Sequence, residues 1–124
     1  MTVFDASALL AYLRGEQGAQ CVADALAQGG SCGAANWSEV AQMVAHRGAS
    51  WPAARAVLLS YPLTVEPVTA ADAETAAAPW PVAKDLSLAD RLCLALAKRM
   101  SDAALTADSA WVTYDFGVTV DLIR

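Results

Sequence analysis

Hydrophobic residues follow two alternating patterns along the chain, short continuous runs and longer stretches with helical spacing. Thr2 to Phe4 is the first short run, typical of a buried strand. After Asp5, apolar side chains recur at helical spacing until Gly15, at Ala8, Leu9, Tyr12 and Leu13. The chain is therefore predicted to open with a strand, a turn and a helix.

The same alternation continues to the end of the chain. Further helices are predicted over residues 17–28, 36–48, 51–59, 70–78 and 87–100, and short strands over 31–34, 63–68, 103–106 and 118–120. The apolar face of the helix after Asn36 comprises Trp37, Val40, Ala41 and Val44, and that of the helix after Ser87 comprises Leu88, Leu92, Ala95 and Leu96. Strands separated by helices predict an α/β fold, with a parallel sheet covered on both faces.

Length and composition favour one domain over residues 1–124. Of its 124 residues, 56% are hydrophobic and 17% charged, which is enough for a core that needs no metal or disulfide. We interpret Pro79-Trp80-Pro81, the one strong break in the second half, as a loop within that domain. Any metal ion would therefore serve function and not folding.

The charge balance argues against simple DNA binding. Thirteen acidic residues outnumber eight basic ones, and the net charge is −5. That argument weakens if some of the acids are metal ligands, because their bound cations would face a phosphate. RNA is therefore not excluded as a substrate.

Cysteine usage and the absence of leader-like segments favour the cytoplasm. The three cysteines form no CxxC pair, and the lone His46 is too isolated to complete a zinc site. The N-terminus lacks a basic region before its apolar stretch, and no run of about 18 apolar residues occurs. We expect a cytoplasmic protein that does not enter the membrane.

Four acidic residues share one predicted structural situation. Asp5, Glu39, Asp90 and Asp108 each lie near the start of a helix or at the end of a strand. In an open parallel sheet these positions meet at one edge, where such folds bind ligands. The alternative is that each acid caps a helix, and Ser87-Leu-Ala-Asp90 and Asn36-Trp-Ser-Glu39 resemble capping boxes. The spacing leaves both interpretations open.

The donor types at this edge suit a hard divalent cation. Thr106 and Asp108 place a hydroxyl and a carboxylate two residues apart at the end of a strand. Mg²⁺ prefers such oxygen ligands and usually keeps several waters. The candidate cofactor is therefore Mg²⁺ or Mn²⁺.

Five blocks of sequence resemble the PIN domain family and, within it, the VapC-type toxins of bacterial toxin-antitoxin pairs. In chain order they are VFDASALLAYLRGE, NWSEVAQMVAHRG, LSLADRLCLALAKR, LTADSAW and GVTVDLIR. The resemblance implies a three-layer α/β/α domain with a five-stranded parallel sheet and a metal-dependent ribonuclease site. It maps the acids of that site onto Asp5, Glu39, Asp90 and Asp108, and the supporting polar positions onto Ser7, Asn36 and Thr106. Position 6 is Ala, where many relatives have Thr.

The expected activity is endonucleolytic hydrolysis of structured RNA by one or two Mg²⁺ or Mn²⁺ ions held by these acids. Arg91, next to Asp90, is expected to orient a carboxylate or contact a phosphate, with a salt bridge as the alternative. The resemblance also implies a cognate antitoxin protein and a homodimer. Candidate contact faces are those of residues 53–59 and 40–44.

Two other functions are considered. Asp5 resembles the nucleophile of phosphatases that form an aspartyl-phosphate, but Ser7 stands where their second acid belongs. A catalytically silent interaction module is the non-enzymatic alternative. Asp115 and His46 are expected to be surface residues, and the tryptophans to be core or interface residues rather than base-stacking platforms.

Overall fold

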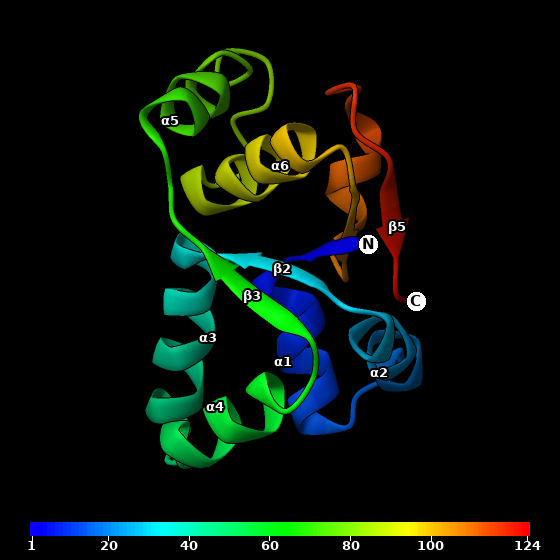
Figure 1. The fold of residues 1–124 in the computed structure, drawn as a ribbon. Coiled ribbons are helices and arrows are strands. Elements are labelled where there is room, and N and C mark those ends of the chain that lie inside the picture. Colours follow the sequence, from blue (N-terminus) through cyan, green and yellow to red (C-terminus); the bar gives the residue numbers. More distant parts are fainter.

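Five parallel strands form one sheet between two layers of helices in the computed structural model, which describes residues 1–124 (Figure 1). The sheet order is β3-β2-β1-β4-β5, with strands β1 (Thr2–Phe4), β2 (Gly30–Gly33), β3 (Leu63–Glu66), β4 (Ala103–Thr106) and β5 (Val120–Leu122). One layer comprises α1 (Ala6–Arg14), α2 (Ala19–Gln28), α3 (Ala34–His46) and α4 (Trp51–Leu59). The other contains α5 (Ala70–Ala77) and α6 (Leu88–Met100). A short 3₁₀ helix, η1 (Ser109–Thr113), follows β4. The predicted three-layer α/β/α fold is confirmed.

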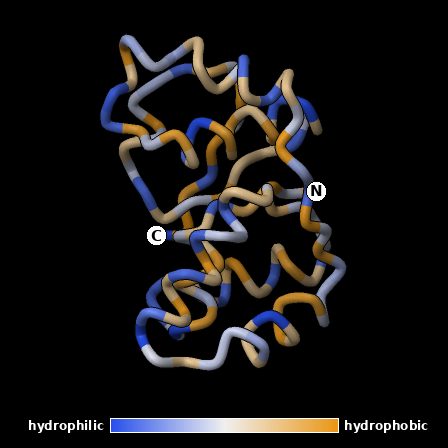
Figure 2. The backbone as a smooth tube through the Cα atoms, turned by 90° about the vertical axis from the view of Figure 1, so that its left-hand side faces the viewer, coloured by the Kyte–Doolittle hydropathy of each residue, from blue (hydrophilic) through white to orange (hydrophobic).

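Each face of the sheet has its own hydrophobic core, because successive strand residues point to opposite sides. On β1, Phe4 joins the core beneath α1–α4 and Val3 joins the core beneath α6. On β4, Leu105 lies in the core beneath α1–α4 and Ala104 lies in the core beneath α6. Figure 2 shows hydrophobic and hydrophilic segments alternating along the chain in both helical layers. Burying each large apolar side chain contributes roughly 2 kcal/mol, so these cores hold the strand ends in place.

The close approach of β2 to β1 depends on Gly30. A Cβ atom at this position would overlap the carbonyl oxygen of Thr2 and lie 2.9 Å from the Phe4 ring. A residue with a side chain would therefore push the two central strands apart. The glycine therefore allows β1 and β2 to pair from their first residues, and α1 and α3 begin after the other ends of these strands.

Several sequence-based boundaries and one helix face were wrong. Helix α2 begins at Ala19 and not at residue 17, β2 covers Gly30–Gly33 and not 31–34, and β3 ends at Glu66 and not at residue 68. Helix α3 begins at Ala34 and not near Asn36, because two helix-favouring alanines precede the periodic apolar positions. β5 starts at Val120 instead of Val118, and its register pairs Thr106 with Leu122. On α6 the buried side includes Cys93, whereas Leu88 is 57% exposed. No helix is long and apolar enough to cross a membrane.

Candidate functional site

Asp5 is the buried centre of the candidate site. It follows β1 and occupies the N-cap position of α1, yet its side chain caps no backbone amide. Instead, its Oδ2 accepts hydrogen bonds from the Ser7 hydroxyl at 2.6 Å and from the Thr106 hydroxyl at 2.8 Å. The residue is only 4% exposed. The helix-cap interpretation is therefore wrong for Asp5, whose carboxylate is positioned by side chains.

The two hydroxyl groups also tie the end of β1 to the end of β4. Ser7 Oγ accepts a hydrogen bond from the Ala107 amide at 2.9 Å, and Thr106 Oγ1 accepts one from the Asp108 amide at 3.1 Å. The oxygen atoms of the two hydroxyls lie 3.1 Å apart. Segments about 100 residues apart in sequence are thus held together around a single carboxylate.

Asn36 extends this network to the helices on both sides of the sheet. Its Nδ2 donates to Glu39 Oε1 at 3.3 Å, to the Ala89 carbonyl at 3.3 Å and, at 3.5 Å, to Asp5 Oδ1. The residue is fully buried, and its Oδ1 has no hydrogen-bond partner. Asn36 therefore lies between two of the acids, and its supporting role stays a prediction.

Glu39 lies in the second turn of α3, since the helix begins at Ala34. The predicted capping box of Asn36 and Glu39 is therefore wrong, because neither residue is at the helix start. Glu39 is half-buried, and its carboxylate is held by the Asn36 amide. Because α3 begins directly after β2, the Glu39 side chain lies at the edge of the sheet where β2 ends.

Asp90 and Asp108 do act as caps. Asp90 forms a capping box with Ser87, in which its Oδ2 accepts the Ser87 amide at 2.9 Å and its own amide donates to Ser87 Oγ. Asp108 Oδ1 accepts the Ala110 amide at 2.9 Å at the start of η1. In each case one carboxylate oxygen accepts the capping bond and the other accepts no hydrogen bond from the protein. Capping therefore leaves both residues a free oxygen.

The four acids are coupled electrostatically. Burial raises the pKa of Asp5, and the charge of Asp90 adds to the increase against the opposing hydrogen bonds. Burial also raises the pKa of Glu39, with further contributions from Asp5 and Asp90. The pKa of Asp90 is raised by burial and by Asp108, although its bonds with Ser87 oppose the shift. The pKa values of Asp5, Glu39 and Asp90 are thus each raised in part by the charge of another acid of the site, as a shared site requires.

A family comparison agrees with this arrangement. The model of the PIN domain matches residues 2–117. This chain belongs to the PIN domain family.

Three solved structures have a similar fold over almost the whole chain. A toxin-antitoxin complex from Klebsiella pneumoniae is similar over 100% of this chain and 98% of that chain, with a TM-score of 0.79 and 18% identity. VapBC2 from Rickettsia felis, bound to a DNA fragment from its promoter, is similar over 97% and 96%, with a TM-score of 0.74 and 11% identity. FitAcB from Neisseria gonorrhoeae is similar over 99% and 98%, with a TM-score of 0.71 and 18% identity. No curated protein matches the chain.

Arg91 occupies a different environment from the one predicted. It is 8% exposed, and it donates to the Ala76 carbonyl at 2.7 Å and to the Leu86 carbonyl at 3.4 Å. It forms neither a salt bridge nor a hydrogen bond with a carboxylate. Its guanidinium links α6 to α5 and to the loop that precedes α6. Its positive charge opposes the rise in the pKa of the adjacent Asp90.

Two further neighbours of the acids in this PIN domain were not predicted from the sequence. Cys32 and Cys93 are fully buried, and burial followed by the charge of Asp5 raises the pKa of both thiols. They therefore remain neutral thiols beneath the acids. Their positions in a buried strand and a buried helix face make them indistinguishable from core residues by pattern alone.

The donor set fits a divalent cation that keeps part of its water shell. No group of three His, Cys, Asp or Glu side chains is close enough together to hold a metal ion directly. Mg²⁺, however, is usually held by one or two carboxylates, with waters and substrate phosphates as the other ligands. The free oxygens of Asp90 and Asp108 and the unpartnered Asn36 Oδ1 are the hard donors that such an ion prefers.

Of the remaining predictions for individual residues, the core position is wrong for Trp80, which is 50% exposed with Lys84 Nζ 4.9 Å from its ring centroid. Asp115 is an exposed loop residue, and His46 is exposed at the end of α3. Trp111 is fully buried in the core, and Trp37 packs against Trp51 with ring centroids 5.1 Å apart.

Proposed function

We propose that this protein is a metal-dependent endoribonuclease and the toxin of a VapBC-type toxin-antitoxin pair. The observation that carries the proposal is the coupling of four carboxylates from β1, α3, α6 and the end of β4 at one edge of a PIN-domain sheet. The similar folds of toxin-antitoxin complexes support it. The proposed substrate is structured RNA, and the proposed cofactor is Mg²⁺ or Mn²⁺.

Asp5, Asp90 and Asp108 are the proposed ligands of the cation, directly or through water. When bound, the cation would act as a Lewis acid toward the scissile phosphate and lower the pKa of water. Glu39 would be a further ligand or would accept the proton of the attacking water, for which its raised pKa and partial exposure suit it. Ser7, Thr106 and Asn36 would keep Asp5 and Glu39 in position.

The aspartyl-phosphate alternative fits this site poorly. Asp5 is 4% exposed, and its Oδ2 already accepts two hydroxyl hydrogen bonds. A carboxylate that attacks phosphorus in line needs an accessible oxygen and a neighbouring acid for the leaving group. The Ser7 hydroxyl supplies neither of these features.

An antitoxin segment is the proposed partner of a groove between α1, α3 and α4. The groove has a volume of about 350 Å³ and is lined mainly by apolar residues, including Leu10, Leu13 and Val57. Arg14 lines it too, with a buried Nη2 that has no hydrogen-bond partner. An amphipathic segment with a carboxylate would cover the apolar surface and pair with this guanidinium.

A homodimer is also proposed, and the two predicted contact faces differ in exposure. Val40 is fully buried, and Val44 is 7% exposed in the wall of the groove, so this face offers little apolar surface of its own. On α4, Val57 is 45% exposed and Leu59 is 36% exposed, so this helix remains a candidate. Sedimentation at high micromolar concentration tests the dimer, and a monomer would contradict it.

The test of function is cleavage of structured RNA by the purified protein with Mn²⁺, with Mg²⁺ and with excess EDTA. We expect internal cuts with either cation and none in EDTA. Undiminished cleavage in EDTA would rule out the metal mechanism. Inactivity towards RNA under all conditions would favour the silent module, and preferential hydrolysis of small phosphoesters would favour the phosphatase.

A further inference from the structure

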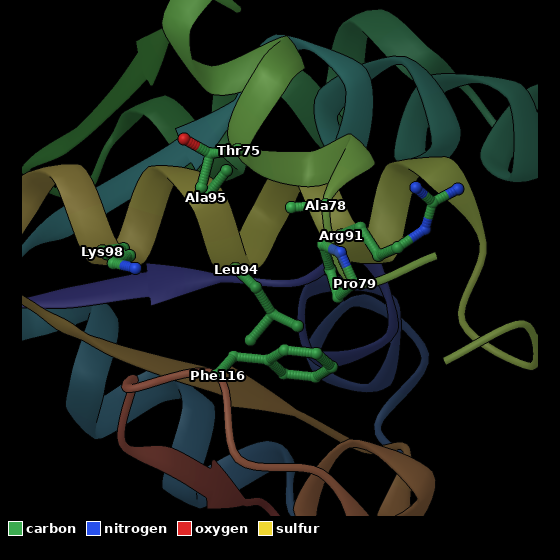
Figure 3. Close-up of a pocket in the computed structure, with 8 residues that line it drawn as sticks. All are labelled: Thr75, Ala78, Pro79, Arg91, Leu94, Ala95, Lys98 and Phe116. Carbon is green, nitrogen blue, oxygen red and sulfur yellow. The ribbon is translucent and has the colours of Figure 1, made fainter. Parts of the chain in front are cut away.

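A cavity of about 470 Å³ lies outside the acidic site, between α5, α6 and the segment after η1 (Figure 3). Leu94 and Phe116 lie side by side in its wall, Lys98 lies at one end, and Arg91 lies at the other. Thr75 also lines it, whereas no acidic residue does. Its volume falls within the range typical of small-ligand sites.

The cavity adjoins the acids along α6. Asp90 and Leu94 are four residues apart and therefore lie on the same side of the helix, one turn from each other. Lys98 is about 12 Å from Asp90 along the helix axis, at 1.5 Å per residue. A strand with one phosphate at the acids would thus reach the cavity with a neighbouring nucleotide.

The charge distribution favours an anion here. The protein has a net charge of −5, yet four of its eight basic residues lie within residues 84–99, namely Lys84, Arg91, Lys98 and Arg99. Arg99 is paired with Asp72, and the guanidinium of Arg91 is bound to backbone carbonyls. Lys98 is exposed and forms no salt bridge, so its ammonium group is available to a ligand.

We propose that this cavity binds an unpaired nucleotide of the RNA strand next to the scissile phosphate. The base would lie against Phe116, and a phosphate would lie at Lys98. An aromatic ring beside a cation is the combination that recognises single-stranded nucleic acid. This inference rests on the proposed ribonuclease function, which supplies the RNA strand.

Fluorescence anisotropy of a labelled single-stranded oligoribonucleotide tests the site directly. In EDTA at low ionic strength the strand stays intact, and we expect Lys98→Gln to weaken binding about fivefold and to reduce the salt slope by about 0.7. Phe116→Leu keeps an apolar side chain but removes the ring, and we expect a similar loss from missing stacking. Arg55→Gln is the matched control, since Arg55 is exposed on α4 and also loses one charge.

Thermal melts establish whether each variant is folded. If Phe116→Leu does not fold, Lys98→Gln still tests the site. Equal weakening by Lys98→Gln and Arg55→Gln would overturn the proposal in favour of bulk charge. Failure of the parent protein to bind the strand would also overturn the proposal. A change of oligomeric state in Lys98→Gln would overturn it too, because the cavity would then belong to a protein interface.

Cleavage with Mn²⁺ separates the two proposals. If the parent cuts RNA and the variants bind normally, the nucleotide site is wrong and the ribonuclease function stands. If the parent cuts no RNA while Lys98→Gln and Phe116→Leu selectively lose binding, the site stands and the nuclease function is wrong. If both hold, Lys98→Gln raises KM and leaves kcat nearly unchanged, because the residue lies away from the acids.

Discussion

The two halves of the acidic site are built differently. Asp5 is buried and held by two hydroxyl groups and a long contact with the Asn36 amide, all from side chains. Asp90 and Asp108 are more exposed and are held by backbone amides at helix starts. The first half depends on packing between distant segments, and the second on local helix chemistry.

This difference shows that helix capping and ligand binding are compatible in one carboxylate. A cap needs a single oxygen of Asp90 or Asp108, so the other oxygen remains free for a cation. Asp5 has no such local role, and nothing but its neighbours holds it in the site. Substitutions should therefore separate stability from activity in the second half far better than in the first.

Asp5→Asn should have the largest effect. We expect ribonuclease activity to fall at least about 100-fold, because even residues that only support metal ligands often cost 10–100-fold. Asp115→Asn, a change of the same type at an exposed loop residue, should retain near-parental activity. Initial cleavage rates with Mn²⁺ measure both, and near-normal activity of Asp5→Asn would remove Asp5 from the site.

Mn²⁺ should stabilise the parent and not the ligand variants. At a concentration 100 times the dissociation constant, an ion that binds only the folded state adds about 2.7 kcal/mol to the free energy of unfolding. Asp5→Asn and Asp108→Asn should lose most of this gain. Denaturant unfolding with Mn²⁺ and with EDTA measures the gain, and an unchanged gain in both variants would mean that the acids do not share an ion.

The capping box separates the two roles of Asp90. Ser87→Ala removes the N-cap hydroxyl and should lower the free energy of unfolding by about 1 kcal/mol while most activity remains. Asp90→Asn can still accept the Ser87 amide, so it should unfold near the parental free energy but lose activity. Paired unfolding and cleavage measurements check this. If Asp90→Asn is active, Asp90 only caps the helix and does not bind the cation.

The smallest predicted effect is a pH dependence of the metal-free protein. Folding raises the pKa of Asp5, Glu39 and Asp90, chiefly through burial, so their ionisation destabilises the fold at neutral pH. This penalty fades as the pH falls through the raised pKa values toward the ordinary value of about 4. The melting temperature in EDTA should therefore rise as the pH falls from 7 toward that ordinary value, and rise less in Glu39→Gln.

Asp72 provides the opposite case in the same experiment. Its burial is outweighed by hydrogen bonds from Arg99 and Thr69, which hold its pKa below the usual value. Its contribution to stability is present above the unfolded pKa and is lost as the pH falls through the folded pKa. Below about pH 4 the melting temperature should drop again, and a steady fall from pH 7 downward would contradict the coupling of the three site acids.

By itself the sequence determined the features that depend on local chemistry. Periodic apolar residues predicted nearly every helix and strand, and Ser87 with Asp90 predicted a capping box, because helical spacing and capping involve residues within a few positions of each other. The five sequence blocks indicated the PIN domain, whose family model matches residues 2–117. The start of α3 and the buried side of α6 were missed, since both depend on what the helix packs against.

Only the tertiary structure decided how the acids are used. Asp5 and Thr106 are 101 residues apart, and their hydrogen bond exists because β1 and β4 are adjacent in the sheet. Because α5 packs on α6, the Arg91 guanidinium donates to the Ala76 carbonyl and not to the acids. Such contacts depend on strand order and on the packing of layers, which involve residues far apart in the chain, and no local pattern specifies them.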